Sequence, residues 1–325
     1  MSQNSNFHIP VLKNETLDLL NPRPGGVYVD ATLGGAGIAA EILKRIAPDG
    51  LLVGIDKDPE AISYSEKRLE RYGKAVKIVK GDFRDLRSIL QSLGLDEIDG
   101  VVFDLGVSSW QLDSGRGFSF MRDEPLSMKM DTSSCGPDAA QIVNTYSPEK
   151  LEDLIRQYGE ERYARRIARA IAERRKKKPI MRTAELVDVI VSAIGSAYKQ
   201  QKIHPATRTF QALRIAVNRE LEAIEQGLPA AIEALAAGGR VCVISFHSLE
   251  DRIVKQIMQR YAGKCICPSG IPSCRCGARS VVRIITRRPI RPSENEIKTN
   301  PRSRSAKLRC AEKLPVGNKS LEREV

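Results

Sequence analysis

Residues 28–37 read YVDATLGGAG, a short β-rich run that passes through an acidic residue into a glycine-rich turn. A helical pattern follows to about residue 46, and residues 51–55 form the next apolar run. A strand, a glycine-rich turn and a helix in this order are typical of the first unit of a cofactor-binding sheet, because glycines let the backbone approach a ligand closely. The stretch predicts an α/β fold with its ligand at this turn.

The same alternation continues to about residue 103. Further apolar runs lie at 75–79 and 100–103, and helical patterns begin at Asp58-Pro59-Glu60 and at residue 83. An acidic first turn with proline is a common helix start, and uniformly apolar strands are expected where both faces of a sheet are covered. The order βαβαβαβ predicts a doubly wound, Rossmann-like parallel sheet.

The alternation stops near Leu105, and for about a hundred residues the chain shows turns and helical patterns without a comparable strand. Apolar runs return at 239–246 (GRVCVISF) and at 281–286, with a helical pattern at 249–260 between them. We therefore expect a helical domain inserted into the sheet domain. The expected parts are residues 1–110 and 207–290 for the sheet domain, 111–206 for the inserted substrate-recognition domain, and 291–325 for a basic C-terminal tail.

The formal net charge of +12 is concentrated in two segments. Residues 156–182 and residues 279–313 each hold 11 Lys and Arg against 3 Asp and Glu. Such segments attract a polyanion and release its counterions on contact, so nucleic acid is the leading class of partner. A solvated helix face and a basic tail are the alternative. Aromatic residues make up 5% of the chain, which argues against a platform of stacked rings for single strands.

The compartment follows from the N-terminus and the apolar runs. The first ten residues, MSQNSNFHIP, lack the basic and apolar regions of a signal peptide, and no run of about 18 uninterrupted apolar residues occurs. We expect a cytoplasmic protein with no membrane contact and with its seven cysteines reduced. Two CxC pairs allow two interpretations, a zinc-binding clip and a metal-free loop. We assign no metal ligand, because cysteine pairs that bind zinc usually read CxxC. These cysteines are Cys265, Cys267, Cys274 and Cys276.

An acidic residue stands at or just after the end of each of the first four predicted strands. Ligands of open α/β sheets lie beyond the carboxyl ends of the strands, so these residues are candidates for the binding site. Asp56 comes 19 residues after Gly37 and is placed to bind both hydroxyls of a ribose. For any one of them, a turn or a helix cap is the alternative role. The four are Asp30, Asp56, Asp82 and Asp104.

The charges around the glycine-rich turn distinguish two cofactors. Residues 35–40 (GAGIAA) also fit the dinucleotide pattern GxGxxA, so the motif alone allows a nicotinamide cofactor. Carboxylates would repel a pyrophosphate, whereas the amino group and the sulfonium of S-adenosylmethionine are cationic and suit Asp30 and Asp104. Asp82 is placed to accept a hydrogen bond from the adenine amine, and Phe83 to contact the adenine ring. We therefore expect S-adenosylmethionine as the cofactor.

Long stretches of the sequence resemble the RsmH (MraW) family of small-subunit ribosomal RNA cytosine-N4 methyltransferases. The matching stretches are HIPVLKNETLDLL at 8–20, YVDATLGGAG at 28–37, GIDKDPEAI at 54–62, DGVVFDLGVSSWQLD at 99–113, RGFSFMRDEPLSMKMD at 116–131, YGEERYARRIARAI at 158–171, HPATRTFQALRIAVNREL at 204–221, GGRVCVISFHSLEDRIVK at 238–255 and NPRSRSAKLR at 300–309. The resemblance implies a class I S-adenosylmethionine methyltransferase with an inserted helical domain. It also implies methylation of the exocyclic N4 amine of a cytidine in the decoding centre of 16S rRNA, within the 30S subunit.

The resemblance also carries the family's cofactor contacts onto this chain. They fall on Ala36, Gly37, Ile38, Asp56, Phe83, Asp104 and Gln111. The first loop departs from the family, which commonly reads GGGHS there, so only backbone contacts are expected to persist at Ala36 and Ile38. Trp110 stands where the family usually has proline, and its alternatives are stacking on a target base and packing as part of a lid.

The chemistry requires hydrogen-bond acceptors that orient the amine toward the methyl group, because an exocyclic cytosine amine is a poor nucleophile. Asp104 and the loop at 106–110 occupy that position, and we assign no general base. For His247, RNA contact or product deprotonation is weighed against a packed neutral histidine beside a helix cap by Ser248.

The sequence leaves two rival functions, a nicotinamide-dependent oxidoreductase and a non-catalytic RNA-binding assembly protein. It leaves the oligomeric state open, with a homodimer as one option. We further expect the two basic segments to form one RNA-binding surface across the mouth of the cofactor pocket.

Overall fold

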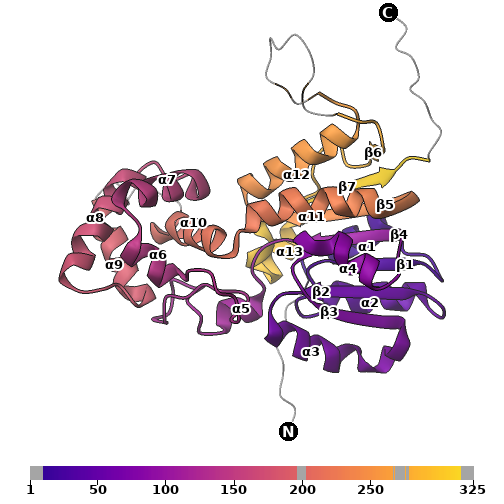
Figure 1. Cartoon of the computed structure of the whole chain (residues 1–325), viewed down its shortest axis with the longest axis horizontal. Coiled ribbons are helices and arrows are strands. Elements are labelled where there is room, and N and C mark those ends of the chain that lie inside the picture. Colours follow the sequence, from indigo (N-terminus) through magenta and orange to yellow (C-terminus); the bar gives the residue numbers. More distant parts are fainter. Residues whose placement is uncertain (1–9, 196–202, 266, 268–274, 276–277, 316–325) are drawn as a thin grey trace, which may run out of the picture. The chain divides into compact units, whose positions relative to one another are not determined.

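The chain forms two compact units. The computed structural model describes residues 10–195, 203–265, 267, 275 and 278–315. One unit comprises Met1–Gly106 and Leu221–Val325, and the other comprises Val107–Glu220 (Figure 1). None of the helices in these described ranges has the length and apolarity that a membrane crossing requires.

The first unit is built on a seven-stranded sheet with the order β3-β2-β1-β4-β5-β7-β6. Strands β1 to β5 are parallel, which confirms the Rossmann-like, doubly wound arrangement predicted for them. The chain reverses its winding direction between β1 and β4, the position where open sheets of this kind bind their ligands. The strands are β1 (Val27–Asp30), β2 (Leu51–Asp56), β3 (Val76–Lys80), β4 (Ile98–Asp104), β5 (Leu235–Ser245), β6 (Val282–Ile284) and β7 (Lys307–Lys313).

Strand β7 corrects the expectation of a basic tail after residue 290. It pairs antiparallel with both β5 and β6, so the sheet is mixed rather than wholly parallel. Its sequence, KLRCAEK, alternates charged and apolar residues, and Leu308, Cys310 and Ala311 are fully buried. Two of its cations share an ion pair with Asp251, which accepts from Arg309 Nε at 2.7 Å and from Lys307 Nζ at 3.2 Å. The sequence of β7 therefore looks like that of a polar tail, although the segment forms a strand of the sheet.

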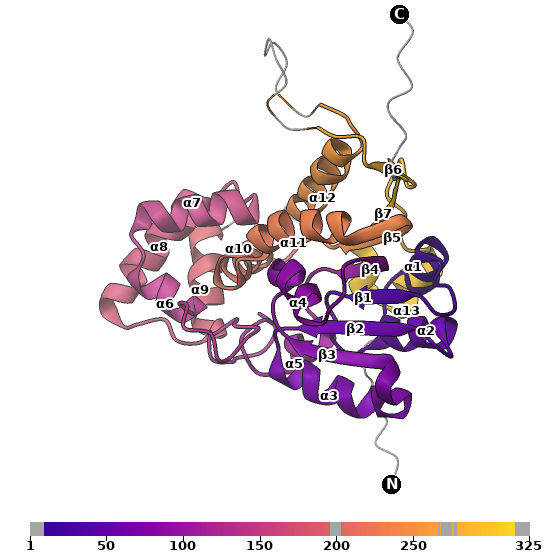
Figure 2. The same ribbon diagram turned by 45° about the vertical axis from the view of Figure 1, so that its right-hand side comes forward.

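Helices cover both faces of the sheet (Figures 1 and 2). Consecutive strand residues alternate between two cores, so that Tyr28 and Leu52 belong to one and Val29 and Val53 to the other. The first core is closed by α1 (Lys13–Leu20), α2 (Gly37–Ile46) and α3 (Pro59–Leu69), and the second by α4 (Leu86–Ser92), α11 (Glu220–Ala234) and α12 (Ser248–Tyr261). The remaining elements of this unit are η1 (Glu70–Ala75), η2 (Phe83–Asp85), α13 (Glu294–Thr299) and η4 (Pro301–Ser305).

The second unit is helical in its described residues and has a core of its own. Its core helices bury apolar side chains such as Leu151, Ile167, Ile190 and Phe210. Helix α10 contributes to this core, so the insertion ends near residue 220 rather than at the predicted 206. The carboxamide of Asn218 accepts a hydrogen bond from Met130 N and donates one to Met128 O, which ties the end of α10 to the second unit. The predicted boundary was wrong because such contacts leave no local pattern in the sequence. The helices are α5 (Ser109–Asp113), α6 (Ala139–Thr145), α7 (Pro148–Gly159), α8 (Ala164–Lys177), α9 (Thr183–Ile194) and α10 (Ala206–Asn218).

Candidate cofactor site

Acidic residues end three neighbouring parallel strands of the first unit. Asp30 is the last residue of β1, Asp56 of β2 and Asp104 of β4. Because β1 lies between β2 and β4, these carboxyl groups gather at one edge of the sheet. The structure therefore brings together three of the residues that the sequence singled out, at the position where the winding of the sheet reverses.

The glycine-rich turn joins β1 to α2 along this edge. Its backbone is tied to both neighbouring strands, because Ala31 N donates to Val102 O and Leu33 N donates to Ile55 O, each at 2.9 Å. Ala36 has a φ of 55°, a left-handed conformation that favours glycine. Its side chain and that of Ile38 are buried in the core, so a ligand at this turn meets their backbone and not their side chains.

Gly37 has a packing role in addition to the predicted one. A β-carbon at this position would collide with the ring of Pro10, so the first helix turn and the N-terminal segment can approach only because residue 37 is glycine. The glycine-rich turn is therefore held by hydrogen bonds to the neighbouring strands and by packing against Pro10.

Asp56 is held by two backbone amides. Gly34 N donates to its Oδ2 at 2.7 Å, and Asp58 N donates to its Oδ1 at 2.9 Å. Burial raises the pKa of this carboxyl above its usual range, although the two amides oppose the shift. The side chain is thus fixed in direction, and each oxygen keeps a lone pair for a further donor such as a hydroxyl.

Asp30 and Asp104 are buried carboxyl groups of a different kind. Burial raises the pKa of Asp30 to about 7, although backbone hydrogen bonds, among them the 3.2 Å bond from Thr32 N to Asp30 Oδ1, oppose the shift. Burial, followed by the negative charges of Asp30 and Glu250, raises the pKa of Asp104 to about 8. Asp104 Oδ1 is buried and accepts no hydrogen bond from any described residue. A cation that enters this site would satisfy that oxygen and stabilise the ionised carboxylates.

Thr32 joins these two acidic residues and was not among the predicted site residues. Its hydroxyl accepts a 2.6 Å hydrogen bond from Asp104 N, and its own backbone N donates to Asp30. The signal was available, since a hydroxyl residue two positions after a strand-ending Asp is typical of such turns.

Asp82 shows the capping interaction that was the alternative to its predicted role. Its Oδ1 accepts from Arg84 N at 3.1 Å, and its Oδ2 lies 2.9 Å from Arg84 Nη2 and 3.4 Å from Lys57 Nζ. Burial alone would raise the pKa of Asp82, but Lys57 and Arg84 together hold it below its usual value. This carboxylate already has its partners, so a bond to an adenine amine stays a prediction.

Phe83 lies between this turn and the core. Its ring meets Phe103 edge-on with a centroid distance of 5.4 Å. A β-carbon on Gly227 would collide with Phe83, so α11 packs directly against it. The ring is held in place and half-buried, which leaves part of it able to contact a ligand.

Gln111 belongs to the second unit and closes a capping box at the start of α5. Ser108 N donates to Gln111 Oε1 at 3.1 Å, and Gln111 N donates to Ser108 Oγ at 3.2 Å. The predicted cofactor contact of Gln111 stays a prediction. Trp110 on the same helix is 44% exposed, which does not fit a fully packed lid residue.

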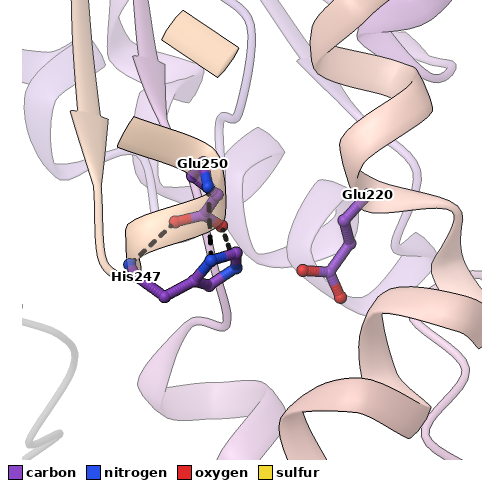
Figure 3. A group of neighbouring side chains, drawn as sticks. All are labelled: Glu220, His247 and Glu250. Carbon is purple, nitrogen blue, oxygen red and sulfur yellow. Dashed lines mark hydrogen bonds and ion pairs between the residues drawn. The ribbon is translucent and has the colours of Figure 1, made fainter. Parts of the chain in front are cut away.

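His247 and Glu250 begin helix α12 (Figure 3). Glu250 N donates to His247 Nδ1 at 3.3 Å, and Glu250 Oε2 accepts from Phe246 N at 2.7 Å. His247 is therefore the cap itself, in place of the Ser248 cap that we expected, and its Nδ1 is not available as a base. Glu250 is 1% exposed and was missed in sequence, although a Glu three residues after a cap is the usual capping-box signal.

The two CxC pairs fall in the segment between α12 and β6, only part of which is described. Cys274 and Cys276 lie outside the described residues, as does most of the loop around them, so the two CxC pairs remain a prediction. Neither Cys265 nor Cys267 forms a disulfide with a described residue. Cys242 is fully buried in β5, as expected for a small apolar side chain.

Comparison with known proteins decides the family. A model of the MraW methylase family matches residues 5–314. The chain belongs to the MraW methylase family. It is 53% identical over 309 residues to the Ribosomal RNA small subunit methyltransferase H of Pelobacter propionicus, with 94% of this chain and 98% of that protein covered. Proteins of the same name from Trichlorobacter lovleyi and Geobacter sulfurreducens are 51% and 52% identical, each over 94% of this chain and over 98% and 99% of their own length.

Membership in the MraW methylase family confirms the predicted family and the predicted cofactor, S-adenosylmethionine. The nicotinamide alternative loses its support, because the weak GxGxxA motif was its only basis. The buried, unsatisfied oxygen of Asp104 and the pair of raised carboxyl pKa values fit a cationic cofactor and would not suit a pyrophosphate.

Proposed function

We propose that this MraW methylase transfers the methyl group of S-adenosylmethionine to the exocyclic N4 amine of a cytidine in the decoding centre of 16S rRNA. The observation that supports methyl transfer most directly is the buried pair Asp30 and Asp104 at the carboxyl edge of the sheet. The RNA substrate is supported by the curated relatives, which are named as small-subunit ribosomal RNA methyltransferases. The position on the RNA rests on the family resemblance.

In this proposal each strand end contacts a different part of the cofactor. Asp56 accepts from the ribose hydroxyls, since its direction is fixed by Gly34 N and Asp58 N. Asp30 and Asp104 face the cationic methionine part, whose charge favours their ionised forms. The backbone of the turn at 36–38 supports the cofactor from below, and Phe83 and Gln111 complete its binding site as the resemblance implies.

The protein's own contribution to the reaction is orientation and electrostatics. When bound, the cofactor supplies an activated methyl group. The target amine is weakly nucleophilic because its lone pair is delocalised into the ring, so acceptors for its N–H groups must favour the pyramidal form. Asp104 is the described acceptor at this edge with an unsatisfied oxygen, and we assign it this role together with the backbone after β4. His247 caps helix α12 through its Nδ1, and we assign no general base.

The substrate places the protein in the cytoplasm, and we propose that it acts on the 30S subunit. Both basic segments remain candidates for the RNA contact. One lies in each unit, at 156–182 and at 279–313, and a single RNA surface made from both stays a proposal.

The direct test is to map the methylated nucleotide. The purified protein is incubated with tritiated S-adenosylmethionine and 30S subunits from cells that lack the gene, and the RNA is digested and analysed by mass spectrometry. We expect one methyl group per subunit on N4 of a single cytidine. Asp104→Asn should abolish the transfer, whereas Asp96→Asn, an exposed carboxylate before β4, should not affect it.

Two results would contradict the proposal. Methylation of a different atom or nucleotide would reject the N4 assignment while it leaves the methyltransferase activity intact. Methylation of no RNA, with S-adenosylmethionine bound, would reject the RNA substrate. A titration with NADH in parallel should show no binding.

A further inference from the structure

A pocket lies at the β6 edge of the sheet, and none of the residues that we assign to the cofactor lines it. We call it the β6 pocket. Its volume is about 660 Å³. It is lined by Ala262, Lys264, Ser280, Val282, Arg283, Ile284, Arg287 and Leu314. Three of these residues are cationic and none is acidic, so the lining carries charge of one sign only.

The frame of the β6 pocket is fixed by backbone hydrogen bonds. Val281 N donates to Tyr261 O at 2.8 Å, which ties the strand to the end of α12. Leu314 N donates to Val281 O at 2.9 Å, which ties it to the end of β7. The side chain of Val282 is 2% exposed, and Ile284 and Leu314 are half-buried beside it. The pocket is thus a formed hollow, and the exposed parts of Ile284 and Leu314 give it an apolar floor.

The three cations differ in how they are held. Arg283 Nη2 lies 2.7 Å from Glu312 Oε1, and the other oxygen of Glu312 lies 2.9 Å from Arg240 Nε. The carboxylate of Glu312 therefore forms ion pairs with two guanidinium groups. Lys264 and Arg287 are exposed and form no ion pair with a described residue. The pocket keeps a positive charge that the rest of the described fold does not neutralise.

Protection of a sheet edge is the simpler explanation for charge at this place. Strand β6 is an edge strand of three residues, and Lys or Arg on such strands discourages pairing with another chain. That role needs charged side chains but no hollow and no apolar floor. The combination of unpaired cations around Val282, Ile284 and Leu314 is better matched to a nucleotide, which has both a phosphate and an apolar ring face.

The position of the β6 pocket separates it from the cofactor site. Along β5, Ile244 pairs with Asp104, whereas Arg240 pairs with Glu312 beside the pocket. These two positions are four residues apart, or about 13 Å of strand. The cofactor site lies at the carboxyl ends of the parallel strands, whereas the β6 pocket lies toward their amino ends. A nucleotide bound in the β6 pocket would therefore help to position the RNA and would not contact the reacting atoms.

We propose that the β6 pocket binds a nucleotide of the substrate RNA, with its phosphate among Lys264, Arg283 and Arg287 and its nucleoside against the apolar floor. The identity of the ligand as RNA rests on the proposed function. The high positive charge of residues 279–313, which include Arg283 and Arg287, supports the same class of ligand.

The test removes the two unpaired cations in the double variant Lys264→Gln/Arg287→Gln. Arg283 is left in place because its ion pair with Glu312 joins β6 to β7. The matched control is Lys74→Gln/Lys77→Gln, which removes two exposed lysines at and beside β3, the other edge strand of the same sheet. Binding of a labelled 24-nucleotide single-stranded RNA is measured by fluorescence anisotropy over a salt series.

We expect the pocket variant to bind RNA on the order of tenfold more weakly at 100 mM salt, with a log–log salt slope that is less steep by about 1.4, or about 0.7 for each lost phosphate contact. The control should keep the wild-type affinity. An unchanged slope in the pocket variant, or an equal loss in the control, overturns the proposal. An equal loss of polyphosphate binding would show a general anion site and overturn the nucleotide assignment.

Two further measurements separate this proposal from the proposed function. The pocket variant should bind S-adenosylmethionine as the wild type does, and at saturating RNA its kcat should be unchanged while KM rises. If the wild-type protein methylates no RNA, the proposed function fails, but the binding series still decides whether the β6 pocket holds RNA.

Discussion

Asp104 lies at the end of β4 with a buried oxygen that accepts no hydrogen bond from the described residues, and this has a consequence for stability. Its pKa is raised to about 8 in the folded protein, far above that of an Asp in an unfolded chain. The folded state then binds the proton more tightly than the unfolded state does. Between about pH 4 and pH 8 the free energy of unfolding should therefore fall as the pH rises, and Asp30, raised to about 7, adds to the same trend.

The first residue-scale prediction concerns Asp104→Asn, which resembles the protonated carboxyl and cannot ionise. Without cofactor, the variant should lose less stability between pH 5.5 and pH 8.5 than the wild type. A difference of about 2 kcal/mol corresponds to roughly 3 °C in Tm for a chain of this length. Calorimetry of both proteins at the two pH values measures it, with Asp96→Asn as the control. Parallel curves for wild type and variant would show that Asp104 does not titrate in this range.

The second residue-scale prediction concerns Asp56, the expected ribose ligand. Asp56→Ala should weaken S-adenosylmethionine binding by about 1–3 kcal/mol, because charge-assisted hydrogen bonds are lost. The same change leaves Gly34 N and Asp58 N without their acceptor, so the turn could also be disturbed. Asp56→Asn keeps one acceptor for these amides and separates the two effects. Calorimetric affinities equal to wild type for both variants, with unchanged Tm, would remove Asp56 from the site.

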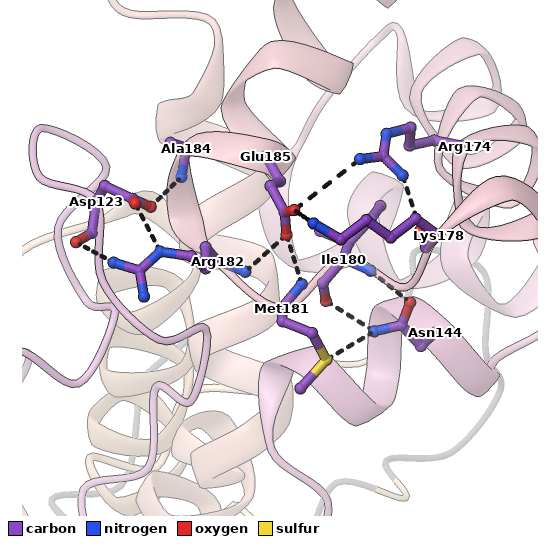
Figure 4. Close-up of polar contacts among 9 residues, drawn as sticks. All are labelled: Asp123, Asn144, Arg174, Lys178, Ile180, Met181, Arg182, Ala184 and Glu185. Atoms are coloured by element: carbon purple, nitrogen blue, oxygen red, sulfur yellow. Dashed lines mark hydrogen bonds and ion pairs between the residues drawn. The ribbon is translucent and has the colours of Figure 1, made fainter.

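Among the elements, helix α8 shows that a run of basic residues can have several roles. Near its C-terminal end, Arg174 Nη1 donates to Lys178 O at 2.8 Å and Arg175 Nη1 donates to Val143 O at 2.7 Å. Figure 4 shows Glu185 of α9 accepting from Lys178 Nζ at 3.0 Å and from Met181 N at 2.9 Å. These cations join α8 to its neighbours. Arg165 and Arg169, one turn apart on the same helix, are exposed and have no partner among the described residues.

The element-scale prediction separates the two sets. Arg165→Gln/Arg169→Gln should weaken RNA binding and lower its salt slope by about 1.4, with Tm unchanged. Arg174→Gln/Arg175→Gln should mainly lower Tm, because it removes two bonds to backbone carbonyls at the end of the helix. Anisotropy and thermal melts on both variants test this. If the second pair reduces RNA binding more than the first at equal stability, the whole run at 174–178 is the RNA contact.

The elements also show what the sequence could predict. Strands β1, β2 and β4 were predictable because both of their faces are buried, which gives continuous apolar runs, and their ends followed from their acidic residues. Strand β7 was not, because Lys307 and Arg309 are paired with Asp251, a residue more than fifty positions away. A long-range ion pair leaves no local pattern. The ion pair of Asp82 with Lys57 could not be predicted for the same reason, because Lys57 lies in the connection after a different strand.

For the whole molecule, the charge is shared between the two units. Each unit contains one of the two basic segments, and each unit holds cations without a described partner, Lys264 and Arg287 at the β6 pocket and Arg165 and Arg169 on α8. The two pairs lie on separate units, each of which has a core of its own. Substitutions in independent regions have additive effects on the binding free energy. A variant that combines both pairs therefore shows whether one RNA molecule contacts both of them.

The last prediction is therefore made for the quadruple variant Arg165→Gln/Arg169→Gln/Lys264→Gln/Arg287→Gln. If one RNA molecule contacts both units, its log–log salt slope should be less steep than that of the wild type by about 2.8, the sum of the two double variants, and the losses of binding free energy should add. The affinity for S-adenosylmethionine should stay at the wild-type value, because none of the four residues lies at the strand ends that carry Asp30, Asp56 and Asp104. Anisotropy with the same RNA over the same salt series measures the slope. A quadruple variant no weaker than one of the doubles would show that RNA uses only one of the basic regions at a time, and the predicted single surface would then be wrong.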